Sequence, residues 1–132
     1  MEIAISRQQS RVPVTVFHVK GDIDANTFDQ LEAQARRAIQ DGTRYLVLDL
    51  GQVDYISSYG IRGISQIYTW LREAAKDENE AEVSQGVRDG SYRSPHLKLV
   101  DPSPAVLKVM TATGLDMFLE FHTDLKQAVA SF

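Results

Sequence analysis

The 132-residue chain contains no cysteine, no membrane-length apolar run and no excess of positive charge. Without cysteine, the protein has no disulfide, no thiolate nucleophile and no cysteine-built zinc or iron–sulfur site, which excludes several classes of enzyme. Every apolar run falls short of the ~20 residues that span a bilayer. The 14 basic and 18 acidic residues give a net charge of −4. This balance disfavours direct binding to duplex nucleic acid, which needs clustered lysine and arginine.

The length and the first residues of the chain suggest its organisation and location. A chain of this length is expected to form one domain over residues 1–132. The opening residues, MEIAISR, lack the basic-then-apolar order of a secretion signal. We therefore expect a cytoplasmic protein that does not insert into membranes.

Strand-like and helix-like patterns alternate along most of the chain. β-branched or continuous apolar runs predict strands, and apolar residues at helical spacing after capping residues predict helices. Strands are expected at 12–19, 45–50, 97–100 and 117–121, and helices at 27–40, 58–75 and 103–113 and after Thr123. Such alternation predicts an α/β fold with an at least partly parallel sheet.

Residues 76–95 differ from the rest in composition, because they contain almost no large apolar side chain. Five acidic residues and one basic residue lie within 77–89, so this stretch accounts for the whole negative excess. We expect a flexible acidic insertion that forms an exposed loop. A contact of this loop with a partner is the alternative to a purely solvated role.

The segment DLGQVDYISSYGIR, residues 49–62, places two hydroxyls at the start of a predicted helix. We call residues 53–60 the serine loop. The first turn of a helix has unpaired backbone N–H groups and a partial positive charge, so a phosphate is stabilised there. Ser57 or Ser58 is therefore a candidate phosphate acceptor. The alternative is that a serine only caps the helix.

Three segments of the chain carry a resemblance to a known family. They are Val16–Thr27 with the turn Gly-Asp-Ile-Asp, Leu46–Arg62 with the serine loop, and Leu97–Phe121. The chain resembles the STAS domain, the family of bacterial anti-sigma factor antagonists and of the cytosolic tails of sulphate transporters. The resemblance implies a single α/β domain with a central mixed β-sheet and helices packed mainly on one side.

The resemblance also implies a site. In the antagonists the loop reads Asp-Ser-Ser-Gly, and the anti-sigma factor, itself a kinase, phosphorylates the serine that follows the aspartate. In this chain Ser57 stands at the aspartate, Ser58 at the acceptor and Tyr59 at the second serine. Ser58 is thus the implied phosphorylation site. The implied partner-binding residues are Asp22, Asp24, Ser57, Tyr59, Gly60 and Arg62. Ordinary turn chemistry remains the alternative for Asp22 and Asp24.

The function that the resemblance implies is a phosphorylation switch without catalysis. Its partner would be an anti-sigma factor with serine kinase activity or a related regulatory protein, and a homo-oligomer stays open. One alternative is an unphosphorylated docking subunit of a stress-signalling or transport assembly, and another is a small enzyme with Ser58 as nucleophile. We expect no cofactor. We also expect no metal, because His18, His96 and His122 show no ligand spacing.

Overall fold

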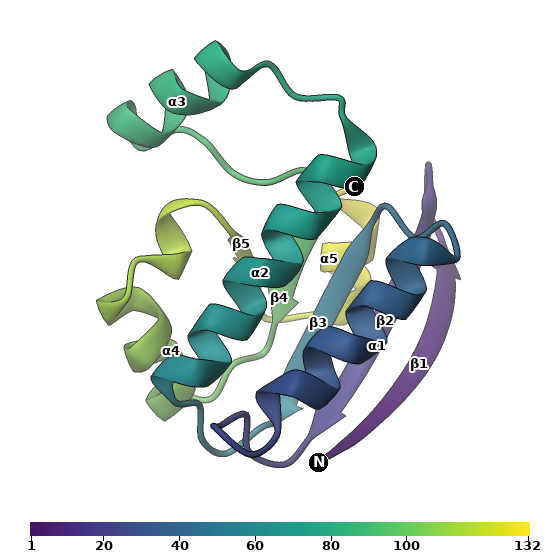
Figure 1. Cartoon of the computed structure of the whole chain (residues 1–132), viewed down its shortest axis with the longest axis vertical. Helices are drawn as coiled ribbons and strands as arrows, with labels where there is room; N and C mark the ends of the chain where they lie inside the picture. Colours follow the sequence, from purple (N-terminus) through teal and green to yellow (C-terminus); the bar gives the residue numbers. More distant parts are fainter.

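A five-stranded sheet forms the centre of the protein (Figure 1), for which a computed structural model describes all 132 residues. Neighbouring strands follow the order of the sequence, β1-β2-β3-β4-β5. Their bounds are β1 Glu2–Gln9, β2 Pro13–Lys20, β3 Leu46–Gln52, β4 Leu97–Val100 and β5 Glu120–His122. The β1–β2 pair is antiparallel and the other three pairs are parallel. The sheet is therefore mixed, as predicted.

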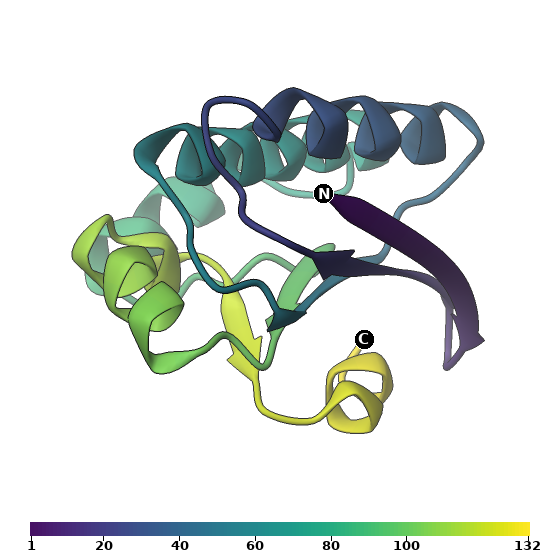
Figure 2. The same cartoon turned by 90° about the horizontal axis from the view of Figure 1, so that it is seen from below.

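The longer helices lie mainly on one face of the sheet (Figures 1 and 2). Helices α1 (Phe28–Gln40) and α2 (Ser58–Ala75) run side by side on this face, and α4 (Pro104–Ala112) with a 3-10 turn (Leu115–Met117) lies beside β5. Only the short α5 (Leu125–Ala130) covers the opposite face. No helix has the length and apolar character needed to cross a membrane.

Two apolar clusters hold these layers together. The larger one fills the space between the sheet and α1 and α2, and includes Phe17, Leu48 and Ile64. The smaller one lies under α5 and includes Val47 and Val129. Successive residues of β3 thus enter different clusters, which explains why its sequence is a continuous apolar run. The predicted fold class is confirmed.

The predicted helices at 27–40, 58–75 and 103–113 are confirmed almost to the residue. Strand β1 was not predicted, because it is an edge strand without a fully buried side chain, and among its residues only Ile3 packs against the core. The last strand lies at 120–122 rather than 117–121, since Met117 belongs to the 3-10 turn. The cap of α5 is Asp124 rather than Thr123: the Asp124 carboxylate accepts a hydrogen bond from the Lys126 N–H.

The prediction of a loop over residues 76–95 is wrong in part, because the segment contains helix α3 (Glu80–Asp89). The Asn79 side chain caps this helix by accepting a hydrogen bond from the Glu82 N–H, and Gly90 ends it in a left-handed conformation. Val83 and Gly86 are the only residues of α3 that are buried. One turn of apolar contact is too little to give the periodic pattern by which helices are recognised in a sequence.

Candidate functional site at the serine loop

The serine loop lies at the carboxyl end of β3, beside the turn that follows β2. Because β2 and β3 are parallel, both chain segments leave the sheet at the same end, where the two strands finish. The Ile23 N–H donates to the Tyr55 carbonyl at 3.0 Å, and the Ser57 N–H donates to the Ile23 carbonyl at 2.9 Å. These bonds fix the start of α2 against residues 21–24. The carboxyl ends of parallel strands are where α/β proteins commonly place their binding sites.

Gly60 allows this close approach. A Cβ atom at position 60 would lie 2.6 Å from the Ile23 carbonyl oxygen and 2.6 Å from Cγ1 of Ile56. Any side chain would therefore push the first turn of α2 away from the 21–24 turn. Gly60 is itself buried, so it shapes the loop and presents little surface to a partner.

The two serines of the loop have different roles in the structure. Ser57 is the N-cap of α2, and its Oγ accepts hydrogen bonds from the N–H groups of Tyr59 at 3.2 Å and Gly60 at 3.4 Å. Ser58 is the first residue of the helix and is exposed, and its hydroxyl forms no hydrogen bond within the chain. The capping role thus falls to Ser57, which leaves the Ser58 hydroxyl available.

The two aspartates of the neighbouring turn also differ. Oδ1 of Asp24 accepts hydrogen bonds from the Asn26 N–H at 2.9 Å and from the Thr27 hydroxyl at 3.2 Å, so this carboxylate holds the turn before α1. The Asp22 carboxylate is exposed and only its backbone carbonyl is engaged, by the Thr27 hydroxyl. Turn chemistry therefore accounts for Asp24, while Asp22 is free for an external contact.

Two exposed tyrosines flank Ser58. Tyr55 is 53% exposed and Tyr59 is 44% exposed. The Tyr59 ring rests on Phe28 of α1, with ring centroids 5.6 Å apart. We define the switch surface as Asp22, Tyr55, Ser58, Tyr59 and Arg62. Tyr55 was not among the predicted site residues, although a large aromatic in a short polar loop is a signal for a contact residue.

Two features of α2, its N-terminal end and Arg62, would stabilise an added anion at Ser58, and they act against the exposed carboxylate of Asp22 on the same surface. The first turn of α2 contains no acidic residue, so the partial positive charge of the helix start is not neutralised there. Arg62 is exposed and follows Ser58 by four residues, which places both on one side of the helix. No histidine or carboxylate forms a hydrogen bond with the Ser58 hydroxyl, whereas a serine nucleophile needs such a base.

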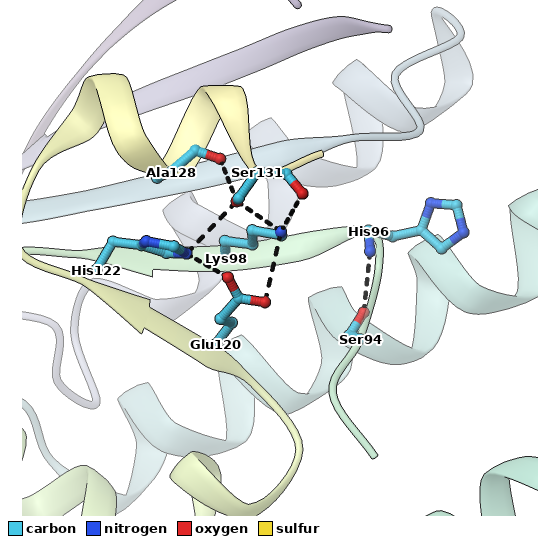
Figure 3. A network of polar contacts seen from close by, with 7 residues as sticks. All are labelled: Ser94, His96, Lys98, Glu120, His122, Ala128 and Ser131. Atoms are coloured by element: carbon cyan, nitrogen blue, oxygen red, sulfur yellow. Dashed lines mark hydrogen bonds and ion pairs between the residues drawn. The ribbon is translucent and has the colours of Figure 1, made fainter. Parts of the chain in front are cut away.

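The three histidines lie away from the serine loop. His18 bridges Asp49 and Ser6 across β1, β2 and β3, at 2.9 Å from Asp49 Oδ2 and 3.0 Å from Ser6 Oγ. His122 contacts Glu120 next to Lys98 and Ser131 under α5 (Figure 3). His96 is buried at the other end of the strands, directly before β4, and contacts Asp77.

A sequential five-stranded mixed sheet, with paired helices on one face and a serine loop at the start of the second helix, defines a SpoIIAA-like α/β domain. The family model of the STAS domain matches residues 5–76 of the chain. The chain belongs to the STAS family.

Known relatives agree with this assignment. The chain is 34% identical over 71 residues to the candidate anti-sigma factor antagonist BtrV of Bordetella bronchiseptica. This match covers 54% of the chain and 61% of BtrV, so the similarity spans about three fifths of that relative's length.

Solved structures of anti-sigma factor antagonists share the fold. The antagonist of Mycobacterium paratuberculosis is 22% identical with a TM-score of 0.69, over 98% of this chain and 93% of the other. Phosphorylated SpoIIAA of Bacillus is 16% identical with a TM-score of 0.61, over 96% of each chain. At these identities the similarity establishes the fold alone. The predicted family is confirmed, and the fold is that of anti-sigma factor antagonists.

Proposed function

We propose that this STAS protein is a regulator of the anti-sigma factor antagonist type, which acts in the cytoplasm by binding a protein partner through the switch surface. Phosphorylation of Ser58 by a partner kinase would turn this binding off. The partner would be an anti-sigma factor with serine kinase activity or a related regulatory protein. In this proposal the chain is a binding protein rather than an enzyme.

The observation that carries the proposal is the difference between Ser57 and Ser58. Because Ser57 caps α2, the Ser58 hydroxyl is exposed and free of internal hydrogen bonds. A kinase can reach such a group without unfolding the loop. The description of SpoIIAA in unphosphorylated and phosphorylated forms lends support from a neighbour with the same fold.

A phosphate at Ser58 would change the surface more than the fold. It adds about −1.5 to −2 charges at neutral pH. The helix start and Arg62 would stabilise this charge locally, so the loop would keep its shape. A partner packed against Tyr55 and Tyr59 would meet a new, strongly hydrated anion at the centre of its contact. The result would be weaker binding.

Phosphorylation is tested with the full chain, ATP and an anti-sigma kinase from the organism that carries this protein. Intact-mass analysis should show one added phosphate on the wild type and on Ser57→Ala, and none on Ser58→Ala. Phosphate on Ser58→Ala, or no phosphate on the wild type with a kinase active on its own antagonist, would contradict the proposal.

Partner binding is tested with the same kinase preparation in the absence of ATP. Ser58→Glu should bind at least about tenfold more weakly than the wild type, because it places a charge at the centre of the contact. Ser58→Ala should bind like the wild type. If Tyr55→Ala and Tyr59→Ala weaken binding while Ser58→Glu does not, the switch surface is a docking surface without a phosphorylation switch.

The exposure of Tyr55 and Tyr59 supports this second candidate function, an unphosphorylated docking subunit of a signalling or transport assembly. In that case the aromatic contact remains and the kinase is absent. The two candidates share a surface and differ only in the effect of charge at position 58.

A further inference from the structure

Three potential metal ligands converge at the other end of α2, far along the chain from Ser58. They are Asp77, Glu78 and His96, and one donor atom from each lies within 4.8 Å of the others. Asp77 and Glu78 follow the end of α2, where Lys76 adopts a left-handed conformation with φ of 53°. His96 directly precedes β4. Because His96 lies 19 positions after Asp77, the three residues form no recognisable sequence motif.

One hydrogen bond of His96 shows which ring nitrogen carries a proton. The His96 side chain is only 2% exposed. It points away from the Lys98–Glu120 network (Figure 3). Nδ1 lies 2.7 Å from the Arg44 carbonyl oxygen, which can only accept, so Nδ1 carries a proton and donates. A histidine that binds a metal through Nε2 commonly makes this kind of bond with its other nitrogen.

The remaining nitrogen faces oxygens only. Nε2 of His96 lies 2.9 Å from both carboxylate oxygens of Asp77. In a neutral ring with the proton on Nδ1, Nε2 is an acceptor, and two acceptors in contact require a cation between them. A proton would satisfy His96 and Asp77 alone.

Glu78 distinguishes a metal ion from a proton. Its Oε1 is buried and has no hydrogen-bond partner, the one such side-chain atom in the protein. Leaving a buried carboxylate oxygen without a partner is costly. A proton on His96 leaves Glu78 Oε1 unsatisfied, whereas a metal ion with three ligands would engage all three residues.

The second oxygen of Glu78 is held in place. The Tyr92 hydroxyl donates to Glu78 Oε2 at 2.7 Å, and the Tyr68 hydroxyl donates to Tyr92 at 3.1 Å. Outer hydrogen bonds of this kind orient metal-binding carboxylates.

A hollow of about 290 Å³ lies beside the cluster, where it is lined by Asp77, Glu78 and Tyr92 together with Arg93, but not by His96. Asp77 is 49% exposed. Metal–ligand bonds of 2.0–2.2 Å place tetrahedral ligand atoms ~3.3 Å apart. Asp77 would therefore move slightly away from Nε2 of His96, which is 2.9 Å away, and ligand atoms up to 4.8 Å apart would move closer by at most about 1.5 Å.

We propose that His96 Nε2, the Asp77 carboxylate and Glu78 Oε1 bind one divalent transition-metal ion of the zinc type, with water completing the coordination. Such an ion would join the α2–α3 connection to the start of β4. The imidazole ligand favours Zn²⁺, Co²⁺ or Ni²⁺ over Mg²⁺ and Ca²⁺, which prefer oxygen ligands alone. This site is independent of the proposed function at Ser58.

The test uses the full, tag-free chain after treatment with EDTA. Calorimetric titration with ZnCl₂ should show one ion bound per chain, and CoCl₂ should produce visible absorption bands. A saturating amount of Zn²⁺ should raise the melting temperature, while MgCl₂ should not. Binding that requires millimolar Zn²⁺, or equal effects of Zn²⁺ and Mg²⁺, would overturn the proposal.

Variants identify the ligands. Glu78→Gln should weaken Zn²⁺ binding by at least about tenfold, and Tyr92→Phe should weaken it by about tenfold through the loss of an orienting hydrogen bond. Glu2→Gln removes the same charge from an exposed acid of β1 away from the hollow, and His122→Gln removes a histidine beside a single carboxylate. Both controls should bind like the wild type. Wild-type affinity in Glu78→Gln would overturn the site even if His96→Gln fails to fold.

Discussion

The two ends of α2 carry polar groups of opposite character. At its start Ser58 presents a hydroxyl that is exposed and has no internal partner. Beyond its end His96 is buried, and both of its ring nitrogens face oxygen atoms. An exposed, unengaged group is suited to modification by another protein, whereas buried, convergent groups are suited to a small ion. The two proposals therefore concern opposite ends of α2: a residue of its first turn, and residues of the loops beyond its last turn.

The largest expected effect concerns the close packing at the start of α2. Gly60→Ala should destabilise the protein by about 1–3 kcal/mol, because the new methyl group overlaps the Ile23 carbonyl and the Ile56 side chain. The measurement is urea unfolding followed by circular dichroism. The control is Gly63→Ala in the same helix, where a Cβ meets no atom closer than 3.5 Å. That variant should be neutral or more stable, and equal losses in both would show that packing at Gly60 is not special.

The next effect separates the two serines. Ser57→Ala should cost about 1 kcal/mol of unfolding free energy, because the capping bonds to Tyr59 and Gly60 are lost. Ser58→Ala should change stability by less than about 0.5 kcal/mol, as for other exposed positions. Each variant is the control of the other in the same unfolding experiment. A larger loss in Ser58→Ala would assign the capping role to the wrong serine.

A smaller effect is expected for a charge at position 58. Ser58→Asp should stabilise the isolated protein by about 0.3–1 kcal/mol at low salt, through the partial positive charge of the helix start. Ser58→Asn has the same shape without the charge and should not show this gain. The stabilisation should shrink in 1 M salt, where charges are screened. Destabilisation by aspartate would mean that the loop resists an anion.

The smallest effect lies at the far end of α3, beyond the proposed metal ligands. The Ser91 hydroxyl and the Ser91 N–H donate to the Asp89 carboxylate and lower its pKa. A lowered folded-state pKa stabilises the protein above the pKa of the unfolded chain, and this contribution is lost as the pH falls through the folded-state value. Ser91→Ala should raise the pKa of Asp89 part of the way to its ordinary value in an NMR titration, with Asp116 as the unaffected reference. No change would show that the turn contributes nothing.

Much of the fold is contained in local sequence patterns. The continuous apolar run of β3 and the apolar stripes of α1, α2 and α4 are periodic patterns of buried residues that a local sequence shows clearly. Strand β1 has no fully buried side chain, and helix α3 buries only the side chain of Val83 and the backbone of Gly86. Their positions depend on contacts outside each element, such as the pairing of β1 with β2 and the bond of Arg72 in α2 to Glu80 in α3, which no periodic pattern within the element records.

The candidate site also has a part that the local sequence predicts and a part that only the folded chain reveals. The serine loop is a contiguous segment, and its place at a helix start follows from the sequence alone. The division of labour between Ser57 and Ser58 depends on the direction of one side chain, and Asp22 joins the surface because the Ile23–Ile56 bridge brings two loops together. The His96 cluster unites residues 19 positions apart in sequence with a backbone carbonyl 52 positions away, so only the folded chain reveals it.

The route of the chain between β3 and β4 explains how α3 is accommodated. This crossover includes both α2 and α3, and its ends are fixed by two adjacent parallel strands. The entropy lost on closing a loop grows only with the logarithm of its length, so even doubling a crossover costs about 0.6 kcal/mol. The domain thus carries an additional helix, with its own polar groups, at a thermodynamic cost smaller than that of losing a single helix cap.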